Sequence, residues 1–206
     1  PFSTERLLNF LNRALENADL KKEKRNLENK LFSSYEIIGN SQSMQKVKSL
    51  ITKLANTESR IFVSGPAGSG KELVARQIHK QSSRSNKPFV VVNGALLDLQ
   101  KYEFELFGSE NVNEIINFGF FEKAKDGTLL IDEVTEIPLE TQAKILRVLI
   151  DQKFRRVNGS KEINVNVRII STSSKNIREE VDKGNFREDL YHRLNVVPIF
   201  LPPLKD

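Results

Sequence analysis

The sequence predicts an α/β fold in which a five-stranded parallel sheet lies between helices, and two patterns along the chain support this. Short apolar runs that fit strands occur at 60–64, 88–92, 128–132, 165–172 and 196–200. Helical spacing of apolar residues alternates with these runs, at 71–82, 95–107, 138–152 and 176–193, with an interruption of the last near Gly184. The strands are mostly continuous apolar runs, which is typical of strands covered by helices on both faces. In such a sheet, ligands bind at the carboxyl ends of the strands.

The first strand leads into a glycine-rich loop, Gly65-Pro66-Ala67-Gly68-Ser69-Gly70-Lys71, and a helix continues from Glu72. The order of strand, glycine loop, lysine and helix is typical of a phosphate-binding loop. Glycines let backbone N–H groups curl around a phosphate, the helix N-terminus adds partial positive charge, and Lys71 reaches the β- and γ-oxygens. Glu72 stands where Ser or Thr usually offers a hydroxyl to magnesium. The alternative is a glycine-rich turn that opens an ordinary helix.

The apolar strand at 128–132 ends in two adjacent carboxylates, Asp132 and Glu133. A strand that delivers Asp132 to the rim of a sheet can hold Mg²⁺ beside a triphosphate. Glu133 is then placed to orient or deprotonate the attacking water. Many acids at strand ends are simply solvated, but downstream of a glycine–lysine loop this pair indicates nucleotide hydrolysis with Mg²⁺ as cofactor.

Composition narrows the class of protein. The chain has 206 residues, no cysteine and only two histidines, which argues against disulfide, zinc-thiolate and histidine-based metal chemistry. No apolar run approaches membrane-spanning length and no signal peptide opens the chain, so we expect a soluble, cytoplasmic protein without a membrane partner. The net charge of +5 is spread over the chain, and no dense basic patch interleaved with aromatic residues indicates nucleic-acid binding.

The first 33 residues are predicted to form a separate linker helix ahead of a nucleotide-binding core at 34–206. Leucines and one alanine form an apolar stripe among Glu and Lys residues, with a shift in register: Leu7, Leu8, Leu11, Leu15, Ala18, Leu20, Leu27 and Leu31. Such a stripe suits a helix that pairs with a second copy of itself, or equally one that packs on its own domain. A further helix is expected to begin near Ser41.

Several blocks occur in a fixed order along nearly the whole chain: Ile37-Ile38-Gly39-Asn40-Ser41, the glycine loop, Val92-Asn93-Gly94-Ala95, Glu105-Leu106-Phe107-Gly108, 127–133 and 186–198. Together these blocks resemble the central AAA+ ATPase domain of the NtrC family, bacterial response regulators that activate transcription through sigma-54. The segment at 138–149 looks most similar to the NtrX branch. In this family Glu normally follows the loop lysine, so Glu72 agrees with the pattern.

The resemblance implies a role for each matching residue of the nucleotide site. The segment with Ile38 and Gly39 would lie against adenine. Lys71 would bind phosphate, Asp132 would hold magnesium and Glu133 would polarise water.

Three further polar residues acquire roles only through the resemblance. Asn93 would hold Glu133 away from water until a ring of subunits is ready, although a simple turn or cap is the alternative. Ser173 and Ser174 replace the family's Thr-Asn at a strand end. Their short hydroxyls would sense the γ-phosphate more weakly than an amide.

Arg187 and Arg193 match the family's arginine fingers, which reach the γ-phosphate of a neighbouring subunit. A guanidinium supplied in trans can raise the rate of phosphoryl transfer by roughly 10³–10⁵ and makes hydrolysis depend on assembly. The alternative is a surface pair bridged to Glu188 or Asp189.

The parent protein would carry a receiver domain before residue 1, and a lid subdomain and a DNA-binding helix-turn-helix after residue 206. A sensor histidine kinase and DNA would then be partners through those domains, and the chain would pair with itself through the linker helix and the core. The family's Gly-Ala-Phe-Thr-Gly-Ala loop, which touches sigma-54, is absent, since residues 109–119 read SENVNEIINFG. This absence argues against contact with sigma-54 RNA polymerase and is also a feature of the NtrX branch.

Two hypotheses follow. The first is an oligomeric ATPase that does mechanical work on a transcription partner. The second is a nucleotide-binding assembly module of a DNA-binding regulator that turns over ATP slowly or not at all. A metabolic kinase would need an acceptor-substrate pocket, for which no residues are found.

Overall fold

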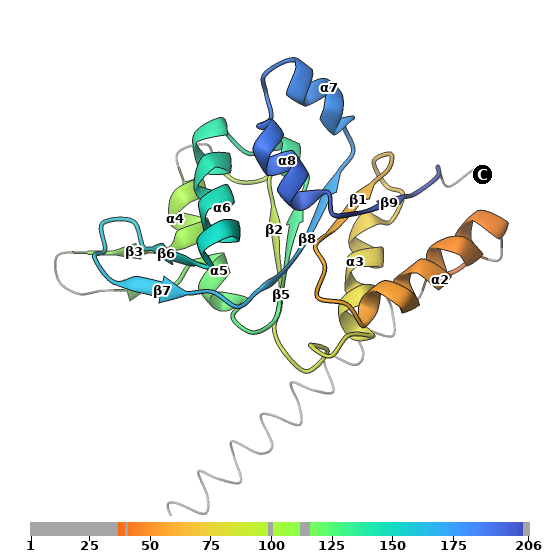
Figure 1. Ribbon diagram of the computed structural model, residues 1–206, viewed down its shortest axis with the longest axis horizontal. Coiled ribbons are helices and arrows are strands. Elements are labelled where there is room, and N and C mark those ends of the chain that lie inside the picture. Colours follow the sequence, from red (N-terminus) through yellow and green to blue (C-terminus); the bar gives the residue numbers. More distant parts are fainter. Residues whose placement is uncertain (1–36, 40, 99–100, 112–115, 204–206) are drawn as a thin grey trace, which may run out of the picture. The chain divides into compact units, whose positions relative to one another are not determined.

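A parallel five-stranded sheet forms the centre of the computed structural model, which describes residues 37–39, 41–98, 101–111 and 116–203 (Figure 1). The strand order is β2-β5-β8-β1-β9. The strands are β1 (Ile61–Ser64), β2 (Phe89–Asn93), β5 (Thr128–Asp132), β8 (Arg168–Ser173) and β9 (Val197–Phe200). The predicted α/β fold and its five parallel strands are confirmed, except that the strand expected from residue 165 begins at Arg168.

Helices cover both faces of this sheet, as Figure 1 shows. One face is covered by α2 (Gln42–Ala55) and α3 (Lys71–Lys80), and the other by α4 (Tyr102–Phe107), α5 (Phe120–Lys123), α6 (Leu139–Asp151) and α8 (Glu188–Leu194). Successive strand residues point to opposite faces. Ile61 and Val63 therefore join the core under α2 and α3, while Phe62 joins the core under α6. This two-sided burial explains why the strands read as continuous apolar runs.

The register of the strands brings the predicted polar residues to one edge of the sheet. Ser64 of β1 lies opposite Ser173 of β8, and Asn93 of β2 lies opposite Asp132 of β5. Ile131 lies opposite Ser171, so the next residues along, Asp132 and Thr172, are neighbours at the same edge. The carboxyl ends of four strands thus converge beside the glycine loop that follows β1.

One predicted helix differs from the observed one, and another is interrupted near Gly184 as the sequence predicted. The helix expected at 95–107 is wrong in its first half, because residues 94–97 form turns and α4 begins at Tyr102. The Asn93 side chain accepts a hydrogen bond from the Ala95 backbone N–H (2.9 Å), and this local bond favours a turn over a helix. The helix expected at 176–193 is divided into α7 (Ile177–Asp182) and α8, with Gly184 between them at φ +75°.

Several short elements were not predicted. Two antiparallel hairpins form, β3 (Ser109–Glu110) with β4 (Ile116–Asn117) and β6 (Lys153–Arg155) with β7 (Glu162–Asn164). Strands of two or three residues are too short to show a period of two. A 3₁₀ turn, η1 (Val134–Glu136), follows β5.

Of the two helices predicted in the N-terminal part of the chain, one is observed and the other lies outside the described residues. Ser41 caps α2 as expected, since its Oγ accepts a hydrogen bond from the Met44 backbone N–H (3.3 Å). The linker helix predicted within residues 1–33 lies outside the described residues. Across the described ranges, the helices are all too short or too polar to cross a membrane.

Candidate nucleotide-binding site

The glycine loop joins the end of β1 to the first turn of α3, as the sequence predicts. Gly68 and Gly70 have φ of +76° and +88°, values that residues with a side chain rarely adopt. Gly65 makes a close approach, because a Cβ there would lie 2.7 Å from the Leu201 carbonyl oxygen. Lys71 is the first residue of α3. The loop therefore presents backbone N–H groups and a helix N-terminus at the carboxyl edge of the sheet, an arrangement suited to phosphate.

Lys71 is buried, with an exposed fraction of 6%, and its ammonium group has three partners. The Nζ atom donates hydrogen bonds to the carbonyl oxygens of Gly65 (3.1 Å) and Pro66 (3.2 Å) within the loop. It also forms an ion pair with Glu133 Oε1 at 3.2 Å. The lysine therefore links the loop after β1 to the acidic end of β5.

Glu133 immediately follows β5 and adopts φ +51°. Its Oε2 atom accepts hydrogen bonds from the backbone N–H and the Oγ–H of Ser174, both at 2.8 Å. Partial burial opposes the ionised carboxylate, but the hydrogen bonds from Ser174 and the charge of Lys71 outweigh burial and hold the pKa of Glu133 below its ordinary value. Glu133 is therefore an ionised carboxylate at neutral pH.

Asp132, the last residue of β5, is oriented by two neighbouring strands. Its Oδ1 accepts a hydrogen bond from Thr172 Oγ1 (2.6 Å) and its Oδ2 accepts one from Asn93 Nδ2 (2.8 Å). Thr172 also accepts a hydrogen bond from the Glu133 backbone N–H (3.0 Å) through the same hydroxyl. Sequence reasoning missed Thr172, although a hydroxyl near the end of an apolar strand was a usable signal.

The expected contact between Asn93 and Glu133 is not the one that forms. The Asn93 amide donates to Asp132 and its oxygen accepts from the Ala95 backbone, so both polar atoms are used away from Glu133. Asn93 is the last residue of β2, which pairs directly with β5 and so faces Asp132. The Glu133 carboxylate is instead bonded by Lys71 and Ser174.

The two serines after β8 lie in different surroundings. Ser174 bonds Glu133, as described above. Ser173 is fully buried, and its Oγ contacts Thr135 Oγ1 (3.1 Å) and donates to the Lys175 carbonyl oxygen (2.9 Å). Of the two, only Ser174 directly contacts a carboxylate of the site.

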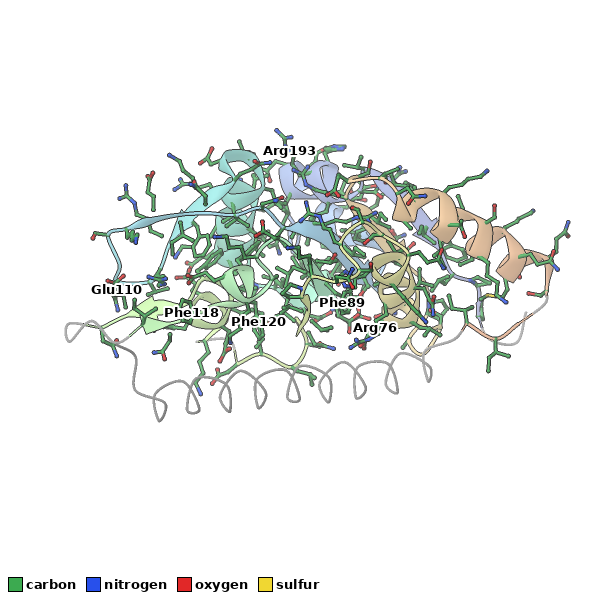
Figure 2. The ribbon with its side chains drawn as sticks, turned by 90° about the horizontal axis from the view of Figure 1, so that it is seen from below. Arg76, Phe89, Glu110, Phe118, Phe120 and Arg193 are labelled. Carbon is green, nitrogen blue, oxygen red and sulfur yellow. The ribbon has the colours of Figure 1, made fainter. Side chains whose placement is uncertain are left out.

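Ile38, Gly39 and Glu72 form no hydrogen bond or ion pair with Lys71, Asp132 or Glu133 among the described residues. Ile38 is 92% exposed, and the carbonyl oxygen of Gly39 accepts a hydrogen bond from Lys48 Nζ (2.8 Å). Glu72 forms an ion pair with Arg76 across one turn of α3, with 2.6 Å between Arg76 Nη2 and Glu72 Oε1. The Arg76 guanidinium in turn lies over the Phe89 ring, 4.9 Å from its centre, and Figure 2 shows the two side chains close together.

The candidate arginine fingers make no hydrogen bond or ion pair with Lys71, Asp132 or Glu133 within the described part of the chain. Arg187 forms a bidentate pair with Asp189, at 3.0 and 2.7 Å, which matches the surface-pair alternative. Arg193, in the last turn of α8, is exposed, and Figure 2 shows its side chain at the periphery of the molecule. Both arginines are therefore accessible to another molecule.

The residues present fit a magnesium–nucleotide complex. Among the described residues, no cluster of three or more His, Asp or Glu forms a metal cage. Magnesium bound with a nucleotide needs only one or two carboxylates, because phosphates and waters supply the other ligands. Asp132 provides one such carboxylate, held in place by Thr172 and Asn93.

Comparison with known proteins agrees with this geometry. Residues 37–200 match the Sigma-54 interaction domain family, which covers most of the chain. The chain belongs to this family. Within the sigma-54 interaction domains it falls in the NtrX branch of NtrC-type AAA+ domains. A curated relative, the nitrogen assimilation regulatory protein NtrX of Azorhizobium caulinodans, is 44% identical over 207 residues, covering 100% of this chain and 45% of that protein.

Solved structures of an NtrX protein are also similar to this chain. NtrX from Brucella abortus in complex with ATP is 48% identical to this chain, with a TM-score of 0.83, and the match covers 98% of this chain and 46% of that one. The same protein in complex with ADP matches with a TM-score of 0.84 at 47% identity. The chain thus spans less than half the length of these relatives.

The segment in which activators of the sigma-54 interaction domain family would carry the Gly-Ala-Phe-Thr-Gly-Ala loop folds as the β3–β4 hairpin. Its sequence, residues 109–119, lacks that motif. Phe118 beside β4 is 58% exposed, and its ring lies 5.5 Å from the Arg156 guanidinium. Residues 112–115, between the two strands, are outside the described ranges.

Proposed function

We propose that this chain is the ATP-binding and ATP-hydrolysing central domain of a two-component transcriptional regulator. One observation carries the proposal. An ionised Glu133 lies between the loop lysine and Ser174, beside an Asp132 that two further strands hold in place. A carboxylate next to a phosphate-binding lysine and a magnesium-binding aspartate is the arrangement that directs water onto a γ-phosphate.

The residues of the site divide the chemistry among them. When ATP binds, the Lys71 ammonium group would exchange its bonds to the loop carbonyls and Glu133 for bonds to the phosphates. The phosphates carry more negative charge, and one ammonium group has only three N–H donors. Release from Lys71 frees one oxygen of Glu133 to accept a proton from water, while Ser174 keeps the other oxygen in place. Magnesium bound at Asp132 would neutralise charge on the phosphates.

The comparisons support nucleotide binding. One of the Brucella abortus NtrX structures is a complex with ATP and another is a complex with ADP, and both match over 98% of this chain. A match of that extent includes the phosphate loop and the acidic strand end of this chain. We extend ATP binding to this chain on that basis.

We further propose that copies of the chain assemble so that Arg187 and Arg193 act on the nucleotide of a neighbouring copy. Both lie at α8, and within the described residues neither bonds the copy's own Lys71, Asp132 or Glu133, so each guanidinium is suited to a role in trans. We also propose a cytoplasmic location, and a histidine kinase and DNA as partners through other parts of the protein. Similarity to proteins named as a response regulator and a DNA-binding transcriptional regulator supports this proposal.

A second candidate function is a nucleotide-binding assembly module that turns over ATP slowly or not at all. The missing Gly-Ala-Phe-Thr-Gly-Ala motif favours it, because without the sigma-54 contact the protein has no need of rapid turnover. In this case ATP stabilises an assembled, DNA-binding form, and remodelling of sigma-54 RNA polymerase is not expected.

The ATP hydrolysis rate per protomer, measured against protein concentration, separates the two functions. The experiment compares the full-length protein with the Glu133→Gln variant, which keeps the shape of the site but lacks the carboxylate. We expect the specific rate to rise with concentration and to fall by about 10²-fold or more in the variant, because general-base catalysis contributes about 10²–10⁴-fold. ATP binding should persist in both proteins.

A flat, near-zero rate despite saturable ATP binding would contradict hydrolysis and leave the assembly module. A rate that does not depend on concentration but disappears in Glu133→Gln would contradict only the action of the arginines in trans.

A further inference from the structure

Two side chains hold α8, one at each end of the helix. At the N-terminal end, Gln142 of α6 is fully buried and its Oε1 accepts a hydrogen bond from the Arg187 backbone N–H (2.9 Å). The Gln142 amide nitrogen donates to the carbonyl oxygens of Ile137 (2.7 Å) and Asn185 (3.1 Å). Gln142 therefore joins the start of α6 to the backbone at the first candidate arginine finger.

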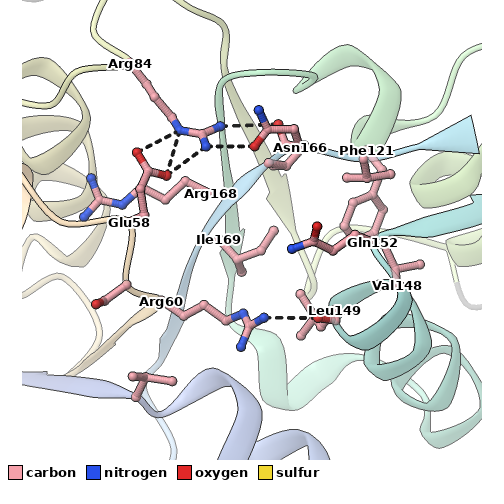
Figure 3. Close-up of a pocket in the computed structure, with 14 residues that line it drawn as sticks. Glu58, Arg60, Arg84, Phe121, Val148, Leu149, Gln152, Asn166, Arg168 and Ile169 are labelled. Carbon is pink, nitrogen blue, oxygen red and sulfur yellow. Dashed lines mark hydrogen bonds and ion pairs between the residues drawn. The ribbon is translucent and has the colours of Figure 1, made fainter.

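At the C-terminal end of α8, the corresponding contact comes from Arg60, the residue before β1. Its guanidinium donates to the carbonyl oxygens of Leu149 in α6 (3.1 Å) and Arg193 in α8 (3.4 Å). Figure 3 shows the Arg60 side chain extended toward Leu149. Arg60 also accepts a hydrogen bond at its own backbone oxygen from Val197 N (3.2 Å), which starts β9. One residue thus connects the ends of α6 and α8 and the start of β9.

The chemistry of Arg60 suits this position. The last four carbonyl groups of an α-helix have no partner within the helix, and those of Leu149 and Arg193 belong to this set. A planar guanidinium can bond two such carbonyls at once, and its positive charge is favourable at two helix C-termini. In the described part of the chain Arg60 has no acidic partner, so its hydrogen bonds go to backbone carbonyls alone.

Neighbouring arginines show that this role is specific to Arg60. Arg60, Arg84 and Arg168 line the same cavity of about 440 Å³ at the amino ends of the strands (Figure 3). Arg84 pairs with Glu58 (2.8 Å) and bonds Asn166, while Arg168 bonds the last carbonyls of α2. Of the three guanidinium groups, only that of Arg60 bonds α8.

Arg60 and Arg193 also interact as charges. Partial burial and the positive charge of Arg193 lower the pKa of Arg60, which indicates that the two guanidinium groups lie within electrostatic reach. Repulsion between the two guanidinium groups favours an Arg193 side chain that points away from Arg60 and into solvent. Arg193 is exposed and forms no ion pair among the described residues, which agrees with this repulsion.

We propose that Arg60 and Gln142 are positioning residues, which clamp α8 onto α6 so that Arg193 and Arg187 are presented to the nucleotide of a second copy of this chain. The inference rests on the proposed function, in which these arginines act in trans. Neither positioning residue touches the nucleotide site of its own copy, so each acts only through the helix that it holds.

A mixing experiment with the full-length protein tests the clamp. The donor carries Glu133→Gln, which disables its own site but keeps its arginines. The acceptor carries Arg193→Ala, which keeps Glu133 but lacks one arginine. Each variant alone should be almost inactive, while the mixture should regain ATP hydrolysis where a donor arginine meets an acceptor site.

Adding Arg60→Met to either partner then assigns the role of Arg60. We expect the restored rate to fall by about tenfold or more when Arg60→Met is in the donor, because small misplacements of a catalytic group cost up to about 10²-fold. The same change in the acceptor should leave the restored rate within about twofold of the parental mixture, since the acceptor's Arg193 is already absent. Gln142→Met provides a second test, with the same dependence on the donor expected through Arg187.

Arg84→Met is the matched control, because Arg84 lines the same cavity and also bonds backbone carbonyls but does not reach α8. It should have the same small effect in donor and acceptor. Equal loss from Arg60→Met and Gln142→Met in both partners, or no loss in either, would overturn the clamp. A parental mixture that regains no activity would instead contradict the proposed action in trans, and the clamp with it.

Discussion

Glu133 shows how a single backbone conformation assembles the site. Along a strand, successive side chains point to opposite faces, so Asp132 and Glu133 would diverge if β5 continued. The strand instead ends at Asp132, and Glu133 adopts a left-handed conformation, φ +51° and ψ +55°, with its N–H bonded to Thr172. A non-glycine residue in this region costs on the order of 1 kcal/mol. This local strain places two carboxylates at one edge, each with its own partners.

The Ser174 hydroxyl is expected to tune the ionisation of Glu133. Hydrogen bonds from Ser174 help to lower the pKa of Glu133, so Ser174→Ala should raise that pKa toward its ordinary value. Since the ionised form activates water, the rate of hydrolysis is lost as pH falls through this pKa. The acidic limb of the rate profile should therefore move to higher pH in Ser174→Ala, as measured by kcat between pH 4 and 7.

Ser173→Ala is the matched control for that experiment, because Ser173 bonds Thr135 and Lys175 and does not contact Glu133. The acidic limb of the pH–rate profile should not move in Ser173→Ala. Equal movement of the limb in both variants would mean that the Ser174 hydroxyl has no specific effect on Glu133.

At the scale of elements, the phosphate loop depends on backbone shapes that a side chain disfavours. Gly68 and Gly184 have nearly the same φ, +76° and +75°, and a Cβ at either would meet no atom within 4 Å. Both positions therefore require a left-handed backbone conformation, although an added Cβ would clash with nothing at either of them. Gly68 belongs to the loop before α3, whereas Gly184 joins α7 to α8.

Gly68→Ala and Gly184→Ala should each lower the free energy of unfolding by about 1–2 kcal/mol, because both place a Cβ in a left-handed conformation. Only Gly68→Ala should also weaken ATP binding, since only that backbone faces the phosphate site. Denaturant unfolding and ATP titration of both variants measure the two effects. Equal ATP affinity in the two variants would contradict a phosphate-binding role for this loop.

The sequence predicted long elements better than short ones. The strands at 61–64 and 128–132 are continuous apolar runs, so their type and position were readable. The start of α4 could not be predicted in this way, because the side chain of Asn93 bonds the backbone of Ala95 and favours turns at residues 94–97. The β3–β4 and β6–β7 hairpins are held by pairing between segments, which no short window of sequence records.

At the scale of the whole molecule, a buried histidine links stability to pH. His79 of α3 is 1% exposed, its Nδ1 contacts Thr128 Oγ1 of β5 at 2.9 Å, and its ring lies 5.1 Å from that of Phe89 in β2. Burial, reinforced by the charges of nearby arginines, lowers the pKa of His79 to about 4, from 6.5. The histidine is therefore neutral between helix and sheet at neutral pH.

Stability should fall as pH drops below 6.5, because the unfolded chain then binds a proton that the folded chain refuses until about pH 4. Between pH 6.5 and 5 this linkage amounts to about 1.6 kcal/mol, because the unfolded histidine is already half protonated at pH 6.5. His79→Leu should flatten the dependence, measured as the free energy of unfolding at both pH values.

His192→Gln is the control for this linkage, because His192 is exposed and is the only other histidine in the sequence. It should retain the pH dependence of the parent. A parental slope that persists in His79→Leu would assign the effect to carboxylates rather than to His79.

The sequence by itself determined the α/β class, the phosphate loop and the acidic end of β5, because each depends on a pattern of residues that are adjacent in the chain. Only the tertiary structure decided which side chains meet there. Ser174 reaches Glu133 across 41 positions, and Arg60 reaches the Arg193 carbonyl across 133. These contacts depend on the order β2-β5-β8-β1-β9, in which β8 lies between β5 and β1. That order follows from packing the whole chain, so no local pattern could assign Ser174 to Glu133 or Asn93 to Asp132.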